Sequence, residues 1–178
     1  QILVALHSHW PSTTGGERMT AMHTLKKCSL FSRMKDDQLE RIIPLCTSVA
    51  VTGDTILFKQ GQVAKHLYVV QEGRAALELS VAASQSGGQA RPRIVATLNV
   101  GEAFGWSAVV EPHVMTLSAS SVGAGRFLLI DGPALKELLG RDRNLGYSFM
   151  TALCGLLSER LMQTRATLIY ERGWAVGV

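Results

Sequence analysis

The chain contains 178 residues, of which 47% are hydrophobic and 18% are charged, and its formal net charge is +4. This length and composition fit one globular domain with its own core and some flanking chain. The lysines and arginines are scattered and form no basic stripe, which argues against a nucleic-acid-binding surface. No apolar run reaches the ~18–20 residues that a membrane span requires, so we expect no membrane insertion.

We expect residues 1–22 to be a flexible extension of the domain. The apolar start QILVAL has no cationic segment before it, so it does not resemble a signal peptide. Met19 follows a loop-like stretch, and residues 1–18 are therefore either an upstream extension or foreign to the native chain.

Residues 23–45 are predicted to be helical, because Leu39, Ile42 and Ile43 recur at helical spacing. Asp36 is a suitable N-cap for the helix that carries them. Pro44 is expected to mark the end of this helix, since proline cannot continue its hydrogen-bonding pattern.

Between Ser48 and Asp131 the pattern changes to short β-type runs separated by glycines and polar turns. Closely spaced short strands of this kind predict a β-sandwich or barrel-like roll of about eight strands. The polar stretch Ser84–Pro92 is expected to be a flexible loop. The predicted strands are Val49–Val51, Thr55–Phe58, Leu67–Val70, Ala75–Leu79, Ile94–Leu98 and Phe127–Ile130.

Helical periodicity returns after Asp131. Gly132–Pro133 is expected to open a short helix, because proline suits a first helical turn. Asn144 is a candidate cap for a long helix that runs to about Ile169, leaving residues 171–178 as a tail. A helix that is apolar on two faces often packs against a partner, so we expect a homodimer through residues 144–169. The two stripes are Leu145, Phe149, Ala152 and Leu156, and Met150, Leu153, Leu157 and Leu161.

The stretch GEAFGWSAVV, residues 101–110, is the most informative motif. Gly101, Phe104 and Gly105 punctuate a strand end, and glycine lets the backbone approach an anion closely because it has no Cβ. Ser107 and Ala108 can begin a short helical turn whose first N–H groups are free to face a phosphate.

This motif resembles the phosphate-binding cassette of cyclic-nucleotide-binding domains, the sensor modules of catabolite-activator-type regulators, cyclic-nucleotide-dependent kinases and gated channels. The resemblance covers residues 24–169. It implies an α+β fold, in which an antiparallel β-roll of the jelly-roll or double-stranded β-helix type is flanked by an N-terminal helix and two C-terminal helices. Other positions similar to the family are Leu30–Phe31, Gly53, Ile56, Gly61, Tyr68 and Gly73.

The chain departs from the family at the two residues that hold the ligand. A Glu that binds the ribose hydroxyl is replaced by Trp106, and an Arg that binds the cyclic phosphate by Met115. Some prokaryotic members of the family read FGWSA at this place, with a proline a few residues later. This chain resembles them in Trp106 and Pro112. Family position makes Arg160 and Thr164 candidate lid residues. The full candidate ligand-binding set is Gly101, Phe104, Gly105, Trp106, Ser107, Ala108, Met115, Thr116, Arg160 and Thr164.

Two interpretations of this site stay open. Either a small ligand, such as a cyclic nucleotide or another small anion, binds in the roll, or Trp106 and Met115 fill it as core residues. The first makes the chain a non-enzymatic sensor and the second a ligand-free dimeric scaffold. A truncated transcription regulator of the catabolite-activator type is a further alternative, although too few residues follow Ile169 for a helix-turn-helix.

Catalysis and metal binding are not expected. The only HxH pattern is His7-Ser8-His9, outside the predicted roll, and no GxSxG or Cys–His signature occurs. Cys28, Cys46 and Cys154 are odd in number and widely spaced, which argues against disulfides and favours a reducing, cytoplasmic setting. We expect all three to be small buried apolar residues.

Overall fold

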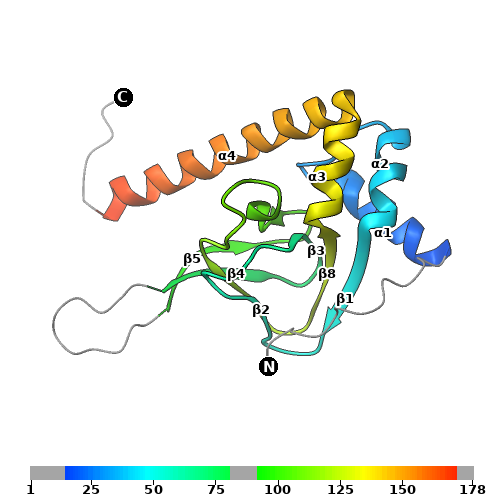
Figure 1. The fold of residues 1–178 in the computed structure, drawn as a ribbon. Coiled ribbons are helices and arrows are strands. Elements are labelled where there is room, and N and C mark those ends of the chain that lie inside the picture. Colours follow the sequence, from blue (N-terminus) through cyan, green and yellow to red (C-terminus); the bar gives the residue numbers. More distant parts are fainter. Residues whose placement is uncertain (1–14, 81–91, 172–178) are drawn as a thin grey trace.

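The structure is a computed structural model that describes residues 15–80 and 92–171. Most of the predicted loop at 84–92 and of the tail at 171–178 therefore lies outside the described residues, as do residues 1–14. The first described helix, α1, spans Gly15–Lys27, so the expected boundary between residues 22 and 23 falls inside a helix. In the described part the chain forms helices, then two sheets, then helices again (Figure 1).

The N-terminal helical region consists of two helices and not one continuous segment. A turn separates α1 from α2 (Asp36–Ile42), and the 3-10 turn η1 (Ile43–Leu45) follows. Asp36 is not the N-cap as expected but the first helical residue, and Lys35 occupies the cap position. The Lys35 backbone N–H donates to Gln38 Oε1 at 3.0 Å, so a side chain in the first turn of α2 bonds back to the cap residue. Pro44 lies in η1, directly after the end of α2, which agrees with its expected role.

Two four-stranded antiparallel sheets form the β-roll, so the predicted α+β fold is confirmed. One sheet has the order β1-β8-β3-β6 and the other the order β2-β7-β4-β5. All predicted strands are present, and two short strands, β6 and β7, are additional. The strands are β1 (Cys46–Val51), β2 (Ile56–Phe58), β3 (His66–Glu72), β4 (Ala75–Ser80), β5 (Pro92–Leu98), β6 (Ala103–Phe104), β7 (Ser118–Ser121) and β8 (Gly125–Asp131).

The sheet containing β3 and β8 separates two cores. Successive side chains of a strand point to opposite faces. On β3, Tyr68 and Val70 face the interior of the roll, whereas Leu67 and Val69 face the helices. Strand β8 alternates in the same way and pairs with β3 in register, with Tyr68 opposite Leu129. Both faces are therefore buried, which explains the uninterrupted apolar runs that predicted these strands.

The helices cover the outer face of that sheet. Phe31 in the turn after α1 contacts Phe149 of the long C-terminal helix, with ring centroids 5.8 Å apart. Below them, a chain of hydrogen bonds joins α1 to the sheet. Gln71 Nε2 donates to Thr24 Oγ1 at 2.9 Å, and Ser48 Oγ donates to Gln71 Oε1 at 2.5 Å. These contacts fix α1 on β1 and β3 through both apolar packing and partly buried polar groups.

Two helices follow the roll. Helix α3 (Gly132–Arg141) begins as predicted, with Pro133 in its first turn and the Asp131 side chain accepting from the Ala134 N–H at 2.7 Å. Helix α4 (Arg143–Glu171) is capped not by Asn144 but by Asp142, whose Oδ1 accepts from the N–H groups of Asn144 and Leu145 at 3.0 Å each.

The two halves of α4 differ in their surroundings. Its first half packs on the domain through four buried side chains: Leu145, Phe149, Leu153 and Leu156. Residues 161–170 are exposed except for half-buried Ile169. In Figure 1 this second half, which we call the arm (residues 161–171), extends past the roll on the side of the β4–β5 hairpin.

Candidate functional site

The cassette segment (residues 101–116) includes the short strand β6 and the tight turn that follows it. Gly105 follows with φ +77°, a left-handed conformation that favours glycine. A Cβ at this position would lie 3.0 Å from the Tyr68 ring and 3.1 Å from the His66 carbonyl oxygen. Glycine is therefore required both by the backbone conformation and by the close approach of β3.

The turn after Gly105 is the 3-10 helix η2, Trp106–Ala108. Ala108 is the first residue of this turn whose N–H bonds back within it, to the Gly105 carbonyl at 3.1 Å. The N–H groups of Trp106 and Ser107 therefore have no acceptor within the turn. The first N–H groups of any helical turn lack such an acceptor. The turn thus begins one residue earlier than predicted, and of the two residues expected to open it, Ala108 uses its N–H within the turn.

Met115, which stands at the position of the family's phosphate-binding arginine, is buried with 3% of its surface exposed. It belongs to the same apolar cluster as Phe58, Phe104 and Ala108. An anion at this position would meet a thioether and aromatic rings and no cation. A desolvated phosphate needs hydrogen-bond donors, and this side chain supplies none.

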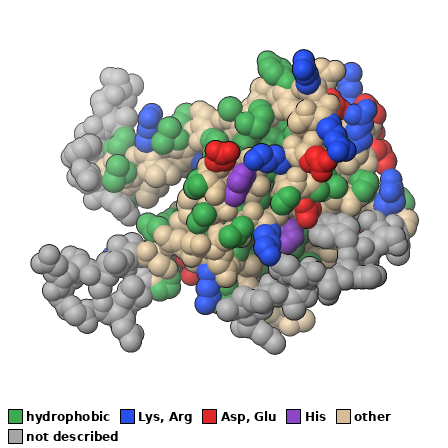
Figure 2. Space-filling view, in the orientation of Figure 1, with side chains coloured by type: hydrophobic (Ala, Val, Ile, Leu, Met, Phe, Trp, Pro, Cys, Tyr) green, Lys and Arg blue, Asp and Glu red, His purple; other side chains and the backbone are tan. Residues whose placement is uncertain are grey.

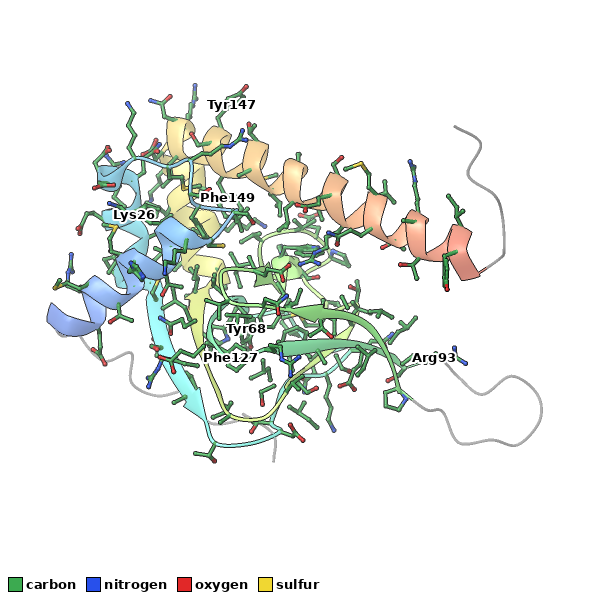
Figure 3. The ribbon with its side chains drawn as sticks, turned by 180° about the vertical axis from the view of Figure 1, so that it is seen from behind. Lys26, Tyr68, Arg93, Phe127, Tyr147 and Phe149 are labelled. Carbon is green, nitrogen blue, oxygen red and sulfur yellow. The ribbon has the colours of Figure 1, made fainter. Side chains whose placement is uncertain are left out.

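Aromatic rings occupy the interior of the roll beside Met115. Tyr68 stacks on Phe104 with centroids 5.1 Å apart and contacts Phe58 at 5.2 Å, while Phe104 meets Phe127 edge-on. Tyr68 and Phe127 lie together between the sheets in Figure 3. Burial raises the pKa of the Tyr68 phenol to about 12, as expected for a group removed from water.

Trp106, at the position of the family's ribose-binding glutamate, packs in a different place from Met115. It is half-buried and contacts the core between the sheet and the helices, not the interior of the roll. The two replaced positions therefore contribute to separate cores.

Arg160 is bound to a residue just before the cassette turn. Its Nη2 donates to Glu102 Oε1 at 2.6 Å, and the two side chains are 19% and 34% exposed. Thr164, the other predicted lid residue, is exposed on the arm and donates to the Arg160 carbonyl. Thr116 is also exposed. The structure thus brings together Phe104, Gly105, Ala108 and Met115, and links Arg160 to them through Glu102.

Sequence reasoning missed two residues of this region. Glu102 is part of the GEAFGW motif, but its partner is 58 positions away, and no local pattern indicates such a contact. His113 has a φ of +59°, and its ring bridges the cassette to α3. Lys136 Nζ donates to His113 Nε2 at 3.0 Å, and Nδ1 donates to the Ser107 carbonyl at 3.2 Å, which fixes the neutral Nδ1–H tautomer.

Residues 15–80 and 92–171 contain no cluster of His, Cys, Asp or Glu with the geometry of a metal site. The HxH pattern at residues 7–9 lies outside this range. No helix of the described chain is long and apolar enough to cross a membrane. Cys28 and Cys46 are buried as expected, but Cys154 is exposed, which corrects that expectation.

Residues 49–142 match the family model of the cyclic nucleotide-binding domain. The cGMP-dependent protein kinase egl-4 of Caenorhabditis elegans is 23% identical over 120 residues, which make up 67% of this chain and 15% of the kinase. The chain thus spans only a small part of that protein.

Solved structures share the fold. A cyclic nucleotide-binding domain from Methylobacillus flagellatus superposes with a TM-score of 0.71 at 16% identity, covering 92% of this chain and 86% of that one. The catabolite activator protein of Thermus thermophilus gives 0.65 at 20% identity, covering 81% and 63%. The family match spans more than half of the chain, and the fold agrees along its length, so the chain belongs to the cyclic nucleotide-binding domain family.

Proposed function

We propose that this chain is a non-enzymatic regulatory domain that works as a homodimer through α4, with its β-roll serving as a packed scaffold. The observation that carries the proposal is a continuous stripe of exposed side chains on α4. It consists of Met150, Cys154, Leu157, Leu161, Thr164 and Leu168, and we call it the seam. Its free thiol fits the reducing, cytoplasmic setting that the sequence favours.

The seam has the spacing of a coiled-coil interface. Its members alternate at intervals of four and three residues, which is the heptad repeat of the a and d positions. Met150, Leu157, Leu161 and Leu168 are each between 37% and 51% exposed. The stripe facing the domain is separate, so burial of one stripe leaves the other available. Figure 2 shows hydrophobic side chains along the projecting part of α4.

The arm gains stability from a partner. Isolated helices shorter than ~12–15 residues are marginal in water, and the arm is a short helical segment whose side chains are almost all exposed. A second copy presents the same apolar seam, so pairing of two arms buries it on both sides. The scaffold role of the roll is supported by Met115 and the aromatic rings that occupy its interior.

The test is the mass of the chain in solution by light scattering. Leu161→Glu places a charge in the seam, whereas Met162→Glu makes the same change at the next residue, which is 60% exposed but outside the seam. We expect the unchanged chain and Met162→Glu to be dimers and Leu161→Glu to be a monomer with unchanged circular dichroism. A monomeric unchanged chain at micromolar concentration would contradict the proposal.

A small-ligand sensor is the second candidate, favoured by the two N–H groups that η2 leaves unpartnered and by the Arg160 guanidinium linked to the same region through Glu102. Thermal-shift measurements with cAMP, cGMP and other small anions test it. A ligand at 100 times its Kd adds about 2.7 kcal/mol to the free energy of unfolding, which such a scan resolves. A flat response to every compound leaves the scaffold function.

A further inference from the structure

Glu102 is a rigid point of the roll. Its backbone N–H donates to the Asn99 carbonyl at 3.0 Å, and its own carbonyl accepts from the Val70 N–H at 3.1 Å. The Glu102 Oε2 atom accepts from the Asn99 N–H at 2.8 Å, which closes the turn before β6. The other carboxylate oxygen, Oε1, is left to accept from Arg160. One side chain therefore holds a turn with one oxygen and α4 with the other.

Arg160 lies at the boundary between the two halves of α4. The buried contacts of the helix end at Leu156, one turn before it, and the exposed arm begins one residue after it. Within the part of the chain that the structure describes, the bond from Arg160 to Glu102 is the one polar contact of residues 157–170 that leaves the helix. The others join Arg160 to Gln163 and the threonines at 164 and 167 to carbonyls one turn earlier.

We propose that the Arg160–Glu102 ion pair is a clamp that fixes the direction in which the arm leaves the domain and couples the arm to the turn at residues 99–102, where the cassette begins. The inference rests in part on the proposed function, because the arm carries the outer half of the seam. Two residues separate Glu102 from Gly105, so a displacement of this turn moves the anchor of α4. In the opposite direction, a displacement of the arm pulls on the same turn.

The environment makes this pair stronger than an ordinary surface ion pair. Both side chains are largely shielded from solvent, so the attraction is less screened than between exposed charges. The 2.6 Å contact is a charge-assisted hydrogen bond, the stronger class of such bonds. Arg165 provides the comparison within the arm, since it is exposed and forms no ion pair with the described residues.

Hydrogen exchange followed by mass spectrometry of the full chain tests the clamp. Every variant is made with Leu161→Glu, so that pairing of two arms does not protect α4. We compare this background with the added changes Arg160→Gln, Glu102→Gln, the exchanged pair Glu102→Arg with Arg160→Glu, and the control Arg165→Gln. Peptides covering residues 157–171 report on the arm, and peptides covering 98–108 report on the turn and the start of the cassette.

We expect Arg160→Gln to accelerate exchange in the arm on the order of tenfold, the size expected from losing one charge-assisted hydrogen bond. Because coupling is reciprocal, the turn peptides should also exchange faster. The exchanged pair should return the arm toward the background rate but not the turn, because an arginine at position 102 cannot accept from the Asn99 N–H. Arg165→Gln should change neither region.

Two results would overturn the clamp. One is an arm in Arg160→Gln that exchanges no faster than in Arg165→Gln. The other is a faster arm with an unchanged turn, which would mean that the pair fixes the helix without coupling it to the cassette. Both results are independent of the dimer, whose failure appears as a monomeric mass of the unchanged chain in light scattering.

Discussion

The first residue of α3, Gly132, lies directly against Ala108 at the end of η2. A Cβ at Gly132 would be 2.7 Å from the Ala108 Cβ, 2.8 Å from the Ala108 carbonyl oxygen and 3.0 Å from that of Lys65. The Gly132 N–H also donates to the Lys65 carbonyl at 2.8 Å. The C-terminal helices therefore begin in contact with the cassette, so that the position of η2 and the start of α3 are fixed together.

The first prediction concerns this contact. Gly132→Ala should destabilise the fold by about 1–3 kcal/mol, because the new methyl group overlaps backbone atoms that cannot move independently. Gly140→Ala is the matched control on the same helix, where a Cβ meets nothing within 4 Å. It should be neutral or stabilising by up to about 1 kcal/mol, the helix preference of Ala over Gly. Urea unfolding of both variants measures the difference, and equal midpoints would contradict it.

The second prediction separates two demands on Gly105. Gly105→Ala combines a left-handed backbone with crowding by Tyr68, whereas Gly61 has a similar φ of +82° and nothing within 4 Å. Gly61→Ala should therefore cost only the conformational term, about 1–2 kcal/mol. Gly105→Ala should cost more, and thermal unfolding should show a lower Tm than for Gly61→Ala. If both variants lose the same stability, the Tyr68 contact at Gly105 has no energetic weight.

The third prediction tests the polar link between α1 and the sheet. Gln71→Leu removes the acceptor of the Ser48 hydroxyl and the donor to Thr24 Oγ1, and we expect a loss of about 1–3 kcal/mol. The Thr24 hydroxyl still donates to the Thr20 carbonyl. Thr24→Val and Gln71→Leu each remove the same Gln71–Thr24 bond, so the double variant should lose less than the sum of the single losses. Strict additivity of the losses in urea unfolding would show that these residues do not form one network.

The sequence predicted the strands whose own residues show an apolar pattern, and it missed those that form only by pairing with distant strands. Strands β3 and β8 were predicted because burial on both faces requires the continuous runs Leu67–Val70 and Phe127–Ile130. Strand β7 was missed because its sequence, SASS, has no apolar pattern, although Ala119 and Ser121 are buried. It is a strand because it pairs with β4 and β2, and pairing with distant strands leaves no trace in four residues.

The same reason limits what the sequence predicts about the site. The GEAFGW motif located the turn and the strained glycine, since both follow from local backbone demands. Periodicity found two apolar stripes on α4, but Leu153, which was placed in the second stripe, is buried against the domain with Leu145 and Phe149 of the first. Cys154 was expected to be buried because cysteine is a small apolar residue, and it is in fact exposed in the seam. The contact of Arg160 with Glu102 depends on the packing of α4 against the roll, which no window of sequence contains.

The last prediction concerns alkaline pH. Burial raises the pKa of the Cys28 thiol to about 11 and that of the Cys46 thiol to about 12, from 9.0 in the unfolded chain. The folded state thus keeps protons that the unfolded state releases. The resulting stability is fully present below pH 9 and is lost as the pH rises through 9 toward the folded pKa values.

Each buried thiol should lower the free energy of unfolding by up to about 1.4 kcal/mol per pH unit in that range. Cys46→Ala removes one titrating group, so its free energy of unfolding should fall less steeply between pH 9 and 11 than that of the unchanged chain. Urea unfolding at half-unit pH intervals measures the two slopes. Parallel curves for Cys46→Ala and the unchanged chain would show that this thiol ionises as easily in the folded state as in the unfolded one.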